Sequence, residues 1–148
     1  MRVHIGSDHA GFALKEAVKA HLIAAGHEVT DVGTFSEESA DYPPIAALVG
    51  RAVASGDSEL GVLVCGTGLG MSIAANKVVG VRAVPVTDVA FAEMARRHNN
   101  ANVISLAGRS TSPETAYAIV DAFLATPFEG GRHQRRVDEI TDLEQVER

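Results

Sequence analysis

The chain has 148 residues and a formal net charge of −6, and 46% of its residues are hydrophobic. This length predicts one domain with an ordinary core, and the acidic balance argues against a nucleic-acid partner, which needs clustered basic surface. One cysteine excludes an internal disulfide, and no apolar run approaches the roughly 20 residues of a membrane span. With no signal-peptide pattern at the start, we expect a soluble cytoplasmic protein without nucleic-acid or membrane partners.

Short apolar runs alternate with segments of helical periodicity along the chain. Prolines and glycines mark several boundaries, and Asp88 and Ser112 stand where helix N-caps are expected. In chain order the pattern predicts strand 2–6, helix 10–26, strand 28–33, helix 43–56, strand 59–65, helix 68–77, strand 81–86, helix 88–99, strand 101–108, helix 112–126 and helix 132–148.

The strands are continuous apolar runs rather than alternating ones, which is typical of a parallel sheet covered on both faces. The sequence shows no internal repeat, low-complexity tract or linker. We therefore predict an α/β fold: a single three-layer α/β/α Rossmann-like domain over residues 1–148, with a five-stranded parallel sheet.

In such sheets ligands bind beyond the carboxyl ends of the strands, near the point where the strand order reverses. Asp8 and His9 follow the first strand, Cys65 ends the third, and Arg109 follows the fifth. His98 and Asn99 instead precede the fifth strand, which puts them at the opposite edge and out of place for a site within one subunit.

The third strand leads into the glycine-rich stretch CGTGLGMS, residues 65–72. A dinucleotide-binding loop has the spacing G-x-G-x-x-G, but here the third glycine comes one residue early and Met71 occupies its place. Asp88, about 20 residues on, leaves a nicotinamide site open, and a tight turn without a ligand is also open. The interpretation we favour is an anion hole formed by backbone N–H groups at a helix N-terminus.

Cys65 has two interpretations, a small buried hydrophobic residue or a reactive thiol. Its place at a helix N-terminus favours the thiolate, and a thiolate there can act as a general base. Such a base could remove a proton from carbon while the adjacent N–H groups stabilise an enediolate. This is aldose–ketose isomerase chemistry, which needs no cofactor.

The remaining charged groups give weaker signals. Asp8 and His9 lack a recognisable third ligand, so we predict no metal site. His98 could simply be a cation at a helix C-terminus. Arg132 and Arg136 share one helical face, which fits either a solvated helix or a clamp for a small phosphorylated ligand.

Five stretches together resemble one family. They are GSDHAGFALK at 6–15, DYP at 41–43, CGTGLGMSIAANK at 65–77, RHNNANV at 97–103 and EGGRHQRRV at 129–137. In this order they resemble ribose-5-phosphate isomerase of the B type, in the group that also contains allose- and galactose-6-phosphate isomerases.

The resemblance implies a homodimer whose active sites combine residues of both subunits, with the helix at about 132–147 at the interface. This would bring His98 to a partner's site; whether dimers associate further is left open. By matching position, Cys65 is the base that moves a proton between C1 and C2, His98 opens the sugar ring, and Thr67 assists ring opening or relays a proton. The implied substrate contacts are the anion-hole residues Gly66, Gly68, Leu69 and Gly70, the sugar or phosphate ligands Asp8, His9, Tyr42 and Asn99, and the phosphate ligands Arg109, Arg132 and Arg136.

One branch of the family has a glutamate base at the position of Met71, so the resemblance places this chain in the cysteine branch. Isomerisation of ribose 5-phosphate is the predicted function. The alternatives are a six-carbon sugar phosphate isomerase, a nucleotide-binding or oxidoreductase module, and a sugar phosphate-binding protein without turnover.

Overall fold

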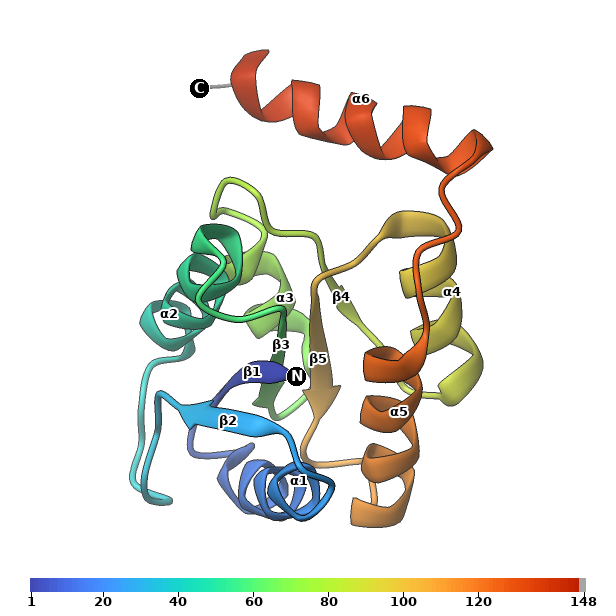
Figure 1. The fold of residues 1–148 in the computed structure, drawn as a ribbon. Coiled ribbons are helices and arrows are strands. Elements are labelled where there is room, and N and C mark those ends of the chain that lie inside the picture. The colour runs from blue at the N-terminus through green and yellow to red at the C-terminus, as the bar shows by residue number, and fades with distance from the viewer. Residues whose placement is uncertain (147–148) are drawn as a thin grey trace.

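The computed structural model describes residues 1–146, which form five strands and six helices (Figure 1). Residues 147–148, the end of the predicted last helix, lie outside the described part. The elements are β1 (Arg2–Ser7), α1 (Phe12–Ala24), β2 (Glu28–Asp31), α2 (Tyr42–Ser55), β3 (Leu60–Cys65), α3 (Leu69–Ala75), β4 (Ala83–Pro85), α4 (Val89–Asn99), β5 (Val103–Ala107), α5 (Pro113–Ala125) and α6 (Arg132–Val146).

The five strands form one parallel sheet in the order β2-β1-β3-β5-β4. The chain moves outward from β1 to β2 and then crosses to β3 on the other side of β1. The strand order therefore reverses between β1 and β3, and a crevice forms beyond their carboxyl ends. Asp8 follows β1 and Cys65 ends β3, so these two residues stand at the reversal point.

Helices cover both faces of the sheet, as predicted. Helices α1, α4 and α5 pack on one face, and α2 and α3 pack on the other (Figure 1). Successive residues of β3 alternate between the two layers: Val62 and Val64 belong to the first core cluster, while Leu63 and Cys65 belong to the second. The central strand is buried on both sides, which explains its uninterrupted apolar sequence.

Helix α6 lies apart from these layers, beyond the end of the sheet at which β5 begins, and approaches α4 (Figure 1). Its Glu144 carboxylate accepts a hydrogen bond of 3.0 Å from the backbone N–H of Gly80, just before β4. In the described part of the chain, no helix combines the length and apolar character needed to cross a membrane.

The predicted caps are confirmed. Asp88 accepts a 2.8 Å hydrogen bond from the N–H of Phe91 at the start of α4, and Ser112 caps α5 in the same way through Thr115. Strand β4 is shorter than the predicted 81–86, and it lies at the sheet edge, where Pro85 can be tolerated without an N–H to donate.

Candidate active site

The carboxyl ends of β1, β3 and β5 border one open cavity of about 640 Å³. Its floor and walls include many of the side chains singled out from the sequence: Asp8, His9, Tyr42, Cys65, Gly66, Thr67, Gly70 and Arg109. The crevice predicted from the strand pattern is thus the place where these residues meet.

The turn after β1 is held by its own polar groups. The buried Asp8 carboxylate accepts a 3.0 Å hydrogen bond from the N–H of Gly11, at the start of α1. The N–H of Ala40 donates to Nδ1 of His9 at 3.1 Å. The Ala40 carbonyl oxygen also lies 3.3 Å from the same Nδ1, so the backbone of Ala40 holds the His9 ring at the edge of the cavity.

Cys65 is the last residue of β3, and the residue as a whole is only 4% exposed. The chain folds back over it at Gly68, whose φ of +79° is in the left-handed region that favours glycine. The N–H of Gly68 donates to the Cys65 Sγ at 3.2 Å, and Ser105 fixes this turn by donating to the Gly68 carbonyl at 2.6 Å. The sulfur therefore has a backbone N–H donor, the kind of group that suits negative charge.

Helix α3 starts directly after this turn. Within residues 1–146, the N–H groups of Gly70 and Met71, in its first turn, have no protein acceptor. The N–H of Leu69 is taken up by the Thr67 hydroxyl at 3.2 Å. Of the two unpaired donors, only Gly70 belongs to the cavity lining, so its N–H is available to a ligand there.

Two glycines of the loop allow close approach of side chains. A Cβ on Gly66 would lie 2.9 Å from Nη1 of Arg109, and a Cβ on Gly70 would lie 2.6 Å from Cζ of Tyr42. The backbone N–H of Arg109 donates to the Gly66 carbonyl at 3.1 Å, which holds Arg109 beside this loop. The glycines therefore bring a cation and a phenol against the loop that carries Cys65.

Several predicted residues lie elsewhere in this chain. His98 and Asn99, at the end of α4, border a separate hollow of about 300 Å³ with Phe91 and Met94. Arg132 and Arg136 are exposed on α6. Gly68 lies under the cavity and Leu69 is 55% exposed, and neither forms part of the lining.

His98 stacks on His133 of α6, with ring centroids 4.3 Å apart. The Glu129 carboxylate lies 3.9 Å from Nε2 of His98 and 3.6 Å from Nε2 of His133, so the three side chains bring metal-ligating atoms together. Desolvation, then His98, Arg132 and Arg136, lower the pKa of His133. The permanent positive charges of Arg132 and Arg136 oppose a metal ion, so we interpret the cluster as a polar contact between α4 and α6.

The Ribose/Galactose Isomerase family model matches residues 3–140. The chain belongs to this family.

Relatives of the ribose/galactose isomerase family match nearly the whole chain. Ribose-5-phosphate isomerase B of Escherichia coli (strain K12) is 49% identical over 144 residues, which are 97% of each protein. The Clostridium thermocellum ribose-5-phosphate isomerase B structure has 45% identity and a TM-score of 0.98, with complete coverage of both chains. A Mycoplasma genitalium ribose-5-phosphate isomerase B structure with bound ribulose-5-phosphate has 44% identity and a TM-score of 0.92, covering 97% of this chain and 96% of the other.

Membership in the ribose/galactose isomerase family confirms the resemblance seen in the five motifs. Met71, at the position of the glutamate in one branch, is fully buried in the core cluster that includes Cys65. It packs and does not reach the cavity lining.

One wall of the cavity is formed by the end of the loop before α2 and by the start of that helix. Beside Tyr42, it is formed by the segment 39–41 and by Pro43 and Pro44. Asp41 occupies the N-cap position of α2, but its side chain accepts no capping hydrogen bond. The motif at 41–43 pointed to this part of the chain, whereas residues 39 and 40 before it carried no such signal.

Proposed function

We propose that this chain interconverts D-ribose 5-phosphate and D-ribulose 5-phosphate in the cytoplasm, as a cofactor-independent isomerase of the pentose phosphate pathway. The observation that carries this proposal is the free thiol of Cys65, at the sheet's reversal point in an open polar cavity. The similarity to ribose-5-phosphate isomerase B of Escherichia coli and of Clostridium thermocellum supports the same substrate.

In the proposed reaction, the Cys65 thiolate removes the proton from C2 of the open-chain aldose. The C2–H electron pair forms the C1–C2 double bond, and the carbonyl electrons move onto O1 to give an enediolate. The thiol then returns the proton to C1, and a second proton passes from O2 to O1. Thr67, in the same cavity, is placed to relay that second proton.

The enediolate oxygen needs donors that are fixed before the reaction. In this proposal the loop from Gly66 to Gly70 supplies them, with the N–H of Gly70 at the cavity lining, and loss of one such donor typically costs about 10²–10³-fold in kcat. The His9 ring and the Arg109 guanidinium, which both line the cavity, bind the sugar hydroxyls and the phosphate.

We propose that His98, Asn99, Arg132 and Arg136 reach the site of a second copy in a homodimer. Helix α6 supports this arrangement, because Ile140 and Leu143 are 43% and 58% exposed on a helix that stands apart from the core layers. Burial of these side chains would stabilise a dimer, and α6 would present its arginines to the substrate phosphate while His98 opens the ring.

A turnover assay without added metal or nucleotide tests the function. It compares ribose 5-phosphate with allose 6-phosphate and galactose 6-phosphate, and we expect the highest kcat/KM for ribose 5-phosphate. A higher value for a six-carbon substrate would reassign the substrate within the same chemistry. Binding of all three without turnover would contradict an enzymatic function.

A further inference from the structure

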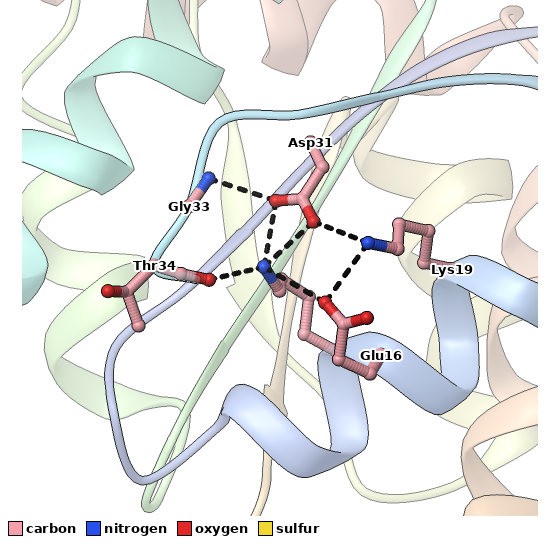
Figure 2. Close-up of polar contacts among 6 residues, drawn as sticks. Glu16, Lys19, Asp31, Gly33 and Thr34 are labelled. Atoms are coloured by element: carbon pink, nitrogen blue, oxygen red, sulfur yellow. Dashed lines mark hydrogen bonds and ion pairs between the residues drawn. The ribbon is translucent and has the colours of Figure 1, made fainter. Parts of the chain in front are cut away.

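Lys15, in the first turn of α1, has its ammonium group in the protein interior. Its side chain is 0% exposed, and its Nζ donates to both carboxylate oxygens of Asp31 at 2.8 Å (Figure 2). The same Nζ donates to the backbone carbonyl of Thr34 at 2.5 Å. The ammonium therefore joins the end of β2 to the first residues of the loop that follows.

Asp31 is the centre of this contact. Its carboxylate also accepts from the N–H of Gly33 and from Nζ of Lys19, both at 2.9 Å (Figure 2). Burial opposes its charge, but the hydrogen bonds from Lys15, Lys19 and Gly33 prevail and lower the pKa of Asp31. Asp31 thus stays ionised at neutral pH, and its carboxylate fixes the backbone of Gly33 at the start of the loop.

The fixed segment leads directly to the cavity. Gly33 and Thr34 exchange hydrogen bonds of 2.7 Å with Ser7, the residue before Asp8. The loop then passes Phe35, whose ring centroid lies 5.0 Å from the Lys15 ammonium, and continues into residues 39–41 of the cavity wall. From that wall, Ala40 donates to the ring of His9.

We propose that Lys15 is a positioning residue of the substrate cavity: its ammonium sets the path of residues 33–41 and, through Ala40, the orientation of the His9 ring. An apolar side chain could fill the same space without the desolvation cost of a buried charge. Unlike an apolar side chain, the Lys15 ammonium has N–H donors that fix the Thr34 carbonyl and the Asp31 carboxylate at defined positions. This inference rests on the proposed function only where it is tested by kinetics with ribose 5-phosphate.

Three variants separate positioning from stability. Lys15→Met keeps the length of the side chain and removes its donors. Lys19→Met is the matched control, because Lys19 contacts the same carboxylate but not the Thr34 carbonyl. The double variant Lys15→Met/Asp31→Asn removes the buried charge that the single variant leaves behind, which should restore thermal stability.

Steady-state kinetics on ribose 5-phosphate provide the first readout. For Lys15→Met and for the double variant, we expect KM to rise by about tenfold or more while kcat changes by less than about threefold. Lys19→Met should keep the wild-type KM. A wild-type KM in the double variant, or an equal rise in Lys19→Met, would overturn the positioning role.

Limited proteolysis with a glutamate-specific protease provides a readout that needs no activity. Glu37 and Glu38 are exposed in the loop, and cleavage after them should be faster in Lys15→Met and in the double variant than in Lys19→Met. Equal cleavage rates in all variants would refute the inference even if the wild type is an active isomerase. Faster cleavage in a chain that shows no turnover would instead refute the proposed function and leave the loop-fixing role supported.

Discussion

The substitution Gly11→Ala tests the close contact between α1 and β3 that shapes the turn carrying Asp8. A Cβ on Gly11 would lie 2.4 Å from the carbonyl oxygen of Val64 and 2.6 Å from its carbonyl carbon. Both atoms belong to a fully buried central strand with partners on each side, and the same carbonyl accepts the N–H of Asp8 at 3.2 Å. The strand cannot move aside locally, so α1 must shift.

Inserting a methyl group into a packed core costs about 1–3 kcal/mol, and contact with immobile backbone places this substitution near the upper end. For a chain of this size, 1 kcal/mol corresponds to about 2–4 °C in the melting temperature. We therefore expect Gly11→Ala to lower the melting temperature by about 6–12 °C.

Circular dichroism melts at one protein concentration measure this effect. Gly50→Ala is the matched control, because its Cβ would meet only side-chain atoms of Val78 and Val81, at 3.2 Å or more, in the helical α2. The gain in helix propensity, about 1 kcal/mol, offsets that mild crowding. If Gly11→Ala melts at the temperature of Gly50→Ala, the packing of α1 on β3 is not as described.

Three further predictions concern pH, the cavity wall and subunit sharing. Burial lowers the pKa of His4 below 6.5, against an opposing effect of Asp57. The contribution of neutral His4 to stability is therefore complete above pH 6.5 and is lost as the pH falls further. The melting temperature of His4→Gln should accordingly fall less than that of the wild type between about pH 7.5 and 5. Gly70→Ala should displace the Tyr42 ring and raise KM about as much as Tyr42→Ala, with little change in melting temperature because that ring is 38% exposed and free to move. A mixture of Cys65→Ala and His98→Asn proteins should recover about one quarter of wild-type activity after random subunit exchange. Half of the dimers would then contain one chain of each kind, and each of these would hold one intact site. No recovery despite proven subunit exchange would exclude a shared site.

The sequence was sufficient for the parts of the fold that local chemistry determines. Periodicity predicted each strand and helix, and the residues after β1 and β3 correctly indicated where Asp8 and Cys65 meet. The helix caps at Asp88 and Ser112 were predictable for the same reason, since each depends on residues within one turn.

Contacts between distant segments were not predictable. His21 has no partner nearby in the sequence, yet it binds the Asp121 carboxylate at 2.8 Å and stacks on Tyr117 of α5. The Lys15–Asp31 pair likewise depends on how α1 lies against β2. The place of residues 39 and 40 in the cavity wall was not predictable either, because a polar loop carries no periodicity.

The central claim is that Cys65 is the base of an isomerase, and one measurement tests it most directly: the kcat of Cys65→Ala with ribose 5-phosphate, with substrate affinity measured by calorimetry on the same sample. The substitution removes only the sulfur from a small buried side chain, so the cavity should persist. Loss of a positioned base costs about 10²–10⁴-fold, and we expect kcat to fall by at least about 100-fold while ribose 5-phosphate still binds. Wild-type turnover by Cys65→Ala would contradict the account.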